Sequence, residues 1–183
     1  MIGKKSLVVV SAMFILLSSS LVFAGGSKED SAVEVADQSV LVEENWGFSW
    51  EFLEDEIEFT VFAPTTGWIG IGFNPSQMMA DAHYVLAYVS EGTVHARDDY
   101  GTGRTMHASD VSLGGTDDVR VISGEEADGM TRVVFALPLD SGDQYDVVFT
   151  QGETYKVLLA YGGNNANNFT GMHRKRTSLD VVF

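Results

Sequence analysis

Apolar and polar residues alternate along most of this chain, and that two-residue period limits its fold more than any other feature. In segment 56–61, Ile57, Phe59 and Val61 are apolar and the residues between them are polar. A period of two describes a strand with one face in a core and the other in solvent. The sequence predicts further strands at 67–73, 83–90, 93–99, 119–123, 130–137, 154–161 and 178–183.

Short turns rather than helices connect these segments. Gly-containing pairs mark turns at 91–92, 114–115, 128–129, 141–142 and 162–163. No stretch of about a dozen residues has the 3.6-residue period of a helix. About nine closely spaced strands with Gly-rich turns predict an all-β, antiparallel sandwich. The longest stretch without strand character, Gly101–Asp118, is expected to be a loop over one end of the sandwich.

The first 24 residues have the order of a secretory signal peptide. Met1–Lys5 holds two lysines, 6–23 is almost entirely apolar or small, and Val22 and Ala24 suit cleavage before Gly25. A retained membrane anchor is the alternative, because an apolar run of about 18 residues is near the lower limit for spanning a bilayer. We expect residues 1–24 to be removed, 25–39 to be a flexible acidic linker, and 40–183 to fold as one domain.

The chain is strongly acidic and contains no cysteine. Its formal charge of −15 becomes −17 without Lys4 and Lys5, which argues against binding nucleic acid or anionic lipid through bulk charge. The absence of cysteine excludes disulfides, thiolate chemistry, iron–sulfur clusters and covalently attached c-type haem. We therefore expect an exported protein of a periplasm or cell exterior that is held together by its core alone.

Two short segments carry residue types that suggest a ligand site. The first, Asn74–Asp81, follows the strand GWIGIGF and places Met78 and Met79 in a polar loop, although methionine usually fills cores. The second, Asn164–Arg176, is rich in Asn and Gly and ends with His173 and three basic residues. A basic cluster in so acidic a chain suits an anion such as a carboxylate or a propionate.

A thioether and an imidazole on separate loops have the chemistry of two axial haem ligands, a pair that favours electron transfer. Gly70 and Gly72 in the strand would let a flat macrocycle approach the backbone. Each feature also has a purely structural explanation. The methionines can plug the end of the sandwich, the histidine can lie exposed, and the glycines can make room for a tryptophan (Trp46, Trp50 or Trp68).

The order of these segments resembles the DOMON domain family. GWIGIGF, NPSQMMADAHYVLAYV, VHARDDYGTG and a late FTGMHRKR before a terminal strand follow the family's order across about residues 40–183. The most specific parts are the glycine strand with the Met-x-x-Asp-Ala after it, and the His-x-x-Arg near the end. The resemblance extends to small secreted bacterial members and to the cytochrome domain of cellobiose dehydrogenase. It implies an immunoglobulin-like β-sandwich that binds either haem or sugar.

Carried over residue by residue, the resemblance implies haem b with Met78 and His173 as the axial ligands of the iron. Met78 precedes Ala80-Asp81 as the family's methionine precedes its small-acidic pair. Met79 is a near-equal alternative, and Met172, beside the histidine, is a more distant one.

Further residues follow from the same resemblance. Arg176 matches the family's basic residue after the histidine, whereas Thr177 stands where the family often has glycine. This departure alters a turn but removes no ligand. The strand expected to contact the cofactor supplies Trp68, Gly70 and Gly72.

These observations leave three functions open. The first is a redox module without a catalytic centre of its own, which passes one electron to or from a periplasmic or membrane partner with a basic surface. The second is a carbohydrate-binding module, because Trp and Tyr faces suit stacking on sugar rings. The third is a calcium-stabilised domain, weighed against a simple solvated acidic face, with oxygen ligands from Asp98, Asp99, Asp117 and Asp118.

Nothing in the sequence favours a hydrolase or a nucleotide-binding enzyme. The chain has no Gly-x-Ser-x-Gly elbow and no phosphate-cradling P-loop. Its four histidines are scattered, with no pair at metal-ligand spacing on one predicted element. Carboxylates are so abundant that no particular pair of them indicates acid–base chemistry.

Overall fold

The computed structural model describes residues 34–36 and 38–183. The predicted signal peptide, residues 1–24, and most of the predicted linker lie outside the described residues. Within the segment predicted as linker, β1 (Glu34–Ala36) pairs with β2 (Ser39–Glu43). Among the described residues, no helix is both long enough and apolar enough to cross a membrane.

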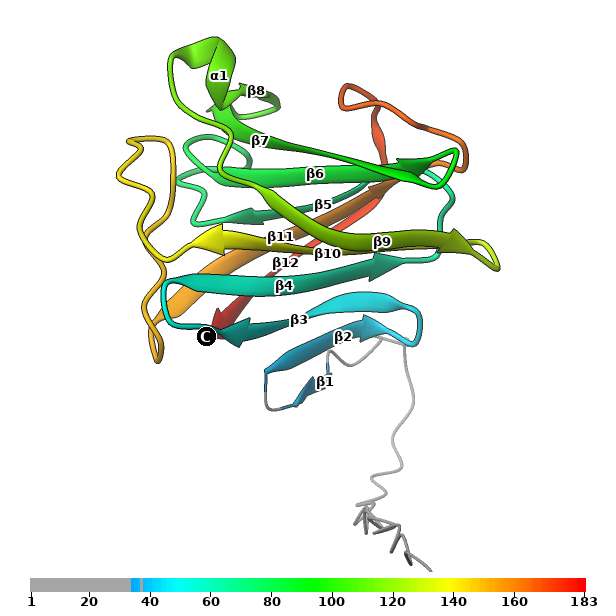
Figure 1. Ribbon diagram of the computed structural model, residues 1–183, viewed down its shortest axis with the longest axis horizontal. Helices are drawn as coiled ribbons and strands as arrows, with labels where there is room; N and C mark the ends of the chain where they lie inside the picture. The colour runs from blue at the N-terminus through cyan, green and yellow to red at the C-terminus, as the bar shows by residue number, and fades with distance from the viewer. Residues whose placement is uncertain (1–33, 37) are drawn as a thin grey trace, which may run out of the picture. The chain divides into compact units, whose positions relative to one another are not determined.

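The described residues form two six-stranded sheets whose strand pairs are antiparallel, which confirms the predicted immunoglobulin-like, all-β sandwich (Figure 1). The first sheet has the order β1-β2-β3-β4-β10-β9 and the second the order β12-β11-β5-β6-β7-β8. Besides β1 and β2, the first sheet contains β3 (Trp46–Phe52), β4 (Glu56–Ala63), β10 (Met130–Pro138) and β9 (Arg120–Ala127). The second contains β12 (His173–Val182), β11 (Thr154–Gly162), β5 (Ile69–Phe73), β6 (His83–Ser90), β7 (Thr93–Gly103) and β8 (Met106–Ser109).

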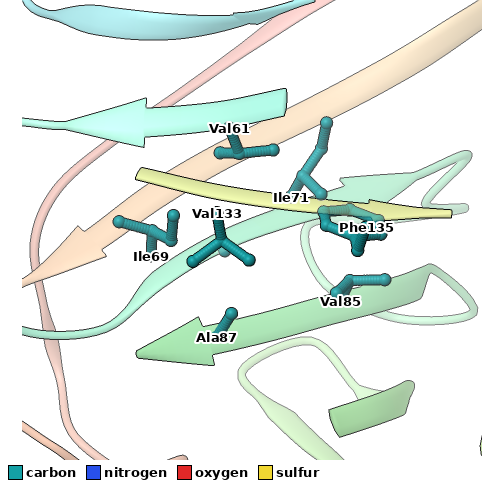
Figure 2. A pocket seen from close by; sticks show the side chains of 8 residues that line it. Val61, Ile69, Ile71, Val85, Ala87, Val133 and Phe135 are labelled. Atoms are coloured by element: carbon teal, nitrogen blue, oxygen red, sulfur yellow. The ribbon is translucent and has the colours of Figure 1, made fainter. Parts of the chain in front are cut away.

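The two-residue period of the sequence becomes the core between the sheets. In β4 every second side chain is buried, and Phe59 lies beside Phe135 of β10 in the antiparallel register. Figure 2 shows the centre of the core, where the gap between the side chains is too small for a water molecule. Its lining comes from both sheets: Val61, Val133 and Phe135 from the first, and Ile69, Ile71, Val85 and Ala87 from the second.

Two stretches differ from the sequence-based expectation. The predicted loop Gly101–Asp118 instead holds the end of β7, the strand β8 and the short helix α1 (Asp110–Leu113). The register explains the difference, because Tyr100 pairs with His83 on one side and with Ala108 on the other, so β7 continues past the predicted end.

The second difference concerns the last strand, which begins at His173 rather than at residue 178. β12 is an edge strand whose first four side chains are exposed, so no apolar alternation marks its start. His173 and Arg176 therefore lie on a strand and not on the loop that the sequence predicts.

Candidate functional site

The predicted ligands Met78 and His173 lie at opposite ends of β5, the glycine strand of the second sheet. The loop 74–82, which carries both methionines, leaves the C-terminal end of β5 and leads into β6. At the other end, Ile69 pairs with Tyr161 of β11, and the next residue of β11, Gly162, pairs with His173. The two loops accordingly appear at opposite sides of the sandwich in Figure 1.

We call the outer face the surface of the second sheet that points away from the first sheet. Alternate residues of β5 point into the core, so Gly70 and Gly72 point to the outer face. The register places Arg176, Ala160 and Gly70 in one row across three strands. The predicted basic residue and the predicted glycines therefore share this face.

Side chains of β6 cover both glycines on the outer face. A Cβ atom at Gly70 would lie 2.7 Å from Leu86 Cδ2, and one at Gly72 would lie 2.3 Å from Tyr84 Cε1. Leu86 and Tyr84 are 8% and 7% exposed, so they fill the space directly above the strand. Burial raises the pKa of Tyr84, which keeps its hydroxyl neutral.

Trp68 belongs to the same layer and lies beneath the loop 163–172. Its indole leaves no room for a Cβ at Gly162, where the distance to Nε1 would be 2.4 Å. The Trp68 backbone N–H donates to Ala166 O at 3.1 Å, which ties the loop to the start of β5. The loop is further held by Phe169, whose ring lies 5.0 Å from that of Tyr88 and 4.6 Å from the Arg97 guanidinium.

The methionine loop is fixed by backbone hydrogen bonds to β7 and by a β-bridge between Gln77 and Ala80. Met78 has a positive φ of 59° and is 40% exposed, which leaves its thioether accessible at the loop surface. Met79 is half-buried, and its carbonyl accepts a bond from Tyr84 Oη at 3.5 Å. Met172 is 89% exposed.

The basic residues 174–176 look like one cluster in the sequence, but the alternation of β12 places neighbouring side chains on opposite faces of the sheet. Arg176 pairs with Ala160 on the outer face, whereas Lys175 pairs with Tyr161, whose side chain lies in the core. Lys175 Nζ forms an ion pair with Glu43 and lies 5.6 Å from the Trp46 ring. Only part of the basic run is therefore available to an anion on the outer face.

The DOMON domain family matches residues 42–162 of this chain. The chain belongs to the DOMON domain family. It is 25% identical over 134 residues to MOXD1 homolog 2 of Drosophila melanogaster, a match that covers 72% of this chain. The chain spans only 17% of that relative's length.

Solved structures with the same fold include two cytochrome domains. One is the cytochrome domain of Myriococcum thermophilum cellobiose dehydrogenase, with a TM-score of 0.55 and 12% identity over 75% of this chain and 74% of that one. The other is the cytochrome b domain of pyranose dehydrogenase from Coprinopsis cinerea, with a TM-score of 0.52 and 14% identity over 75% of each chain. At these identities the similarity shows that the fold is shared.

This DOMON domain also contains a buried polar group that the sequence did not reveal. Asp98 and Asp99, two of the four oxygen ligands that the sequence suggests for calcium, point to opposite faces of β7. Asp99 binds Arg97 and His107 on the outer side of the strand. Asp98 instead meets His83 and Asp146 inside the sandwich. The four interior residues His83, Asp98, Asp110 and Asp146 are called the buried carboxylate cluster below.

Proposed function

We propose that this domain binds haem b on the outer face of the second sheet and transfers single electrons, with Met78 and His173 as the axial ligands. The observation that carries the proposal is membership of the DOMON family together with the fold shared with two cytochrome domains. The two proposed donors lie at opposite ends of β5, and axial ligands of one iron must lie close together on its two sides, so joint ligation requires the loops 74–82 and 163–172 to rearrange. Arg176 lies on the outer face.

The family and the fold support the same proposal. The chain is a DOMON domain, and two solved structures of this fold are cytochrome domains. Methionine and histidine ligation raises the potential of haem iron and suits electron transfer. When bound, the haem would supply a one-electron couple to a chain that contains no cysteine.

The residues of the outer face fit a haem in donor type and in charge, but the glycines do not leave an open slot. Tyr84 and Leu86 cover Gly72 and Gly70, so haem binding requires these side chains or the loop 163–172 to move aside. Buried Tyr84, Leu86 and Trp68 would then exclude water from one side of the cofactor. Arg176 is exposed and free to pair with a propionate.

Met79 is the second candidate for the thioether ligand. Met78 is 40% exposed, whereas Met79 is half-buried and its backbone carbonyl accepts a hydrogen bond from Tyr84 Oη. Both methionines lie in the loop that follows β5, so substituting each one separately is needed to identify the thioether ligand.

The test is an absorption spectrum of the purified, reduced protein after haem has been supplied. We expect a sharp Soret band with resolved α and β bands, and the loss of that low-spin spectrum in His173→Ala and in Met78→Ala. Loss in Met79→Ala instead would assign the thioether to Met79. Met106→Ala and His95→Ala are matched controls, since both residues are exposed and neither is a proposed ligand.

Two results would contradict the proposal. One is a protein that stays colourless after addition of haemin. The other is a spectrum that neither His173→Ala nor any single methionine variant changes.

A carbohydrate-binding function is the second candidate, and one observation favours it. The rings of Tyr88 and His95 stack at 4.7 Å with an interplanar angle of 15°, and Phe169 packs beside Tyr88. Partly exposed aromatic faces of this kind suit stacking on sugar rings. A glycan array tests it, with Tyr88→Ala expected to remove any binding. Haem uptake without glycan binding would exclude this function.

The remaining parts of the proposal concern where the domain acts. We propose export to a periplasm or cell exterior, from the signal-like order of residues 1–24. The acidic charge of the chain suits a redox partner with a basic surface. Electron transfer that slows steeply as salt is raised would support such a partner.

A further inference from the structure

The buried carboxylate cluster gathers ionisable groups from four separate segments. His83 begins β6, Asp98 lies in β7, Asp110 begins α1, and Asp146 lies between β10 and β11. His83, Asp98 and Asp110 are no more than 2% exposed, and the Asp146 side chain is 7% exposed. One ligand atom each from His83, Asp98 and Asp146 lies within 4.8 Å of the others.

Within the part of the chain that the structure describes, five buried side-chain atoms of this cluster have no hydrogen-bond partner. They are His83 Nε2, Asp98 Oδ1, both carboxylate oxygens of Asp110, and Asp146 Oδ1. His83 Nε2 lies 3.1 Å from Asp98 Oδ1 and 3.6 Å from Asp146 Oδ1. Buried polar atoms are almost always satisfied, and a buried carboxylate without a partner is costly, so a concentration of such atoms requires an explanation.

Neighbouring groups orient two of the carboxylates toward the centre. Asp98 Oδ2 accepts the backbone N–H of Asp118 at 3.3 Å, and Asp146 Oδ2 accepts the Ser141 hydroxyl at 2.6 Å. Each carboxylate therefore has one oxygen occupied at the rim and one unpartnered oxygen directed at the cluster. Outer partners that fix ligand orientation in this way are typical of metal sites.

The imidazole of His83 does not balance the negative charge. Its Nδ1 accepts the backbone N–H of Val147 at 3.2 Å, so the neutral ring carries its proton on Nε2, which faces the carboxylates. Three aspartates thus meet one neutral donor. The neighbouring carboxylates raise the pKa of His83 against the effect of its burial, but a second proton would have to enter at Nδ1, which already accepts the Val147 bond.

We propose that Asp98 and Asp146 hold one hard divalent cation, calcium, in the buried carboxylate cluster, with Asp110 as a further buried carboxylate of the cluster. His83 acts as a positioning residue rather than as a ligand, with its Nε2 3.1 Å from Asp98 Oδ1. The set of donors is then entirely oxygen, which is what Ca²⁺ takes, whereas zinc sites in proteins usually include thiolate or imidazole donors. The site lies inside the sandwich, apart from the outer face, and does not depend on the haem proposal.

The cation would join two segments that are distant in the sequence. Asp146 belongs to the stretch between β10 and β11, so an ion shared with Asp98 would tie that stretch to β7. A ligand that binds only the folded state raises its stability by mass action. Calcium should therefore raise the melting temperature of the domain.

The test uses the purified protein after treatment with a chelator, titrated separately with CaCl₂, MgCl₂ and ZnCl₂. We expect one Ca²⁺ per chain by calorimetry and a rise in melting temperature of several degrees at saturating Ca²⁺. Asp98→Asn and Asp146→Asn should each lose most of this response. Asp140→Asn is the matched control, because Asp140 is exposed in the same segment as Asp146 and its carboxylate caps Gly142 N–H.

Two outcomes would overturn the proposal. The first is a melting temperature and a heat signal that millimolar Ca²⁺ leaves unchanged, together with a higher stability of Asp110→Asn, which would show that protons alone neutralise the cluster. The second is stoichiometric Zn²⁺ binding without Ca²⁺ binding that His83→Gln abolishes, which would make the imidazole a ligand. Metal analysis of the protein as purified gives an independent reading if a variant fails to fold.

Discussion

Replacing Gly72 with alanine would place a methyl carbon 2.3 Å from Tyr84 Cε1 and 2.4 Å from Tyr84 Cδ1. The ring cannot turn away freely, because it is 7% exposed and its hydroxyl meets the Met79 carbonyl. Such overpacking costs about 1–3 kcal/mol. In a domain of this size each kcal/mol corresponds to about 2–4 °C, so the melting temperature should fall by roughly 2–12 °C.

Thermal unfolding of the haem-free protein, followed by circular dichroism, measures this effect. Gly163→Ala is the control, because a Cβ at Gly163 meets no heavy atom within 4 Å and its φ is not in the left-handed range. The double variant Gly72→Ala, Tyr84→Leu should recover part of the loss. Equal melting temperatures for Gly72→Ala and Gly163→Ala would refute the tight packing of Tyr84. They would mean that the space above the glycine strand is open to a cofactor.

Three further predictions concern other parts of the structure. Burial and neighbouring carboxylates raise the pKa of Asp110 from 3.8 to about 7. Between these two pH values the folded, chelator-treated protein therefore keeps a proton on Asp110 that the unfolded chain releases. Stability in urea should consequently fall as pH rises from about 4 to about 7, and Asp110→Asn should flatten that slope. Phe169→Ala removes the contacts with Tyr88 and Arg97, and hydrogen exchange of residues 163–172 should become faster, with a loss of about 1 kcal/mol or more in global stability. Trp68→Phe removes an indole N–H that is buried without a partner, so the melting temperature should change by less than that of Trp68→Ala.

The sandwich could be read from the sequence wherever one face of a strand is apolar and the other polar. The alternation at 56–61 predicts β4, and the apolar run 83–90 matches β6 residue for residue. Two edge strands were missed in whole or in part. They are β8, and the first half of β12, whose four exposed charged or polar residues show no apolar alternation.

The candidate site was predictable only in part for a related reason. A glycine strand followed by methionines and a late histidine can be recognised as an order of motifs, but which side of a strand each residue faces depends on register. Pairing of Val85 with Asp98 and of Tyr84 with Asp99 sends two adjacent carboxylates to opposite sides. Asp146 lies far from Asp98 in the sequence, so no spacing between residues predicts the buried carboxylate cluster.

The exposed run His173–Arg176 has a further consequence, because it lies on the edge strand of the second sheet. An edge strand presents unpaired backbone groups to which a strand of another molecule can add, and charged side chains discourage such addition. If the edge strands of two copies met side by side, the positively charged residues of one copy would lie close to those of the other. The exposed charged residues at the start of β12 therefore discourage the addition of a strand from another molecule at this edge.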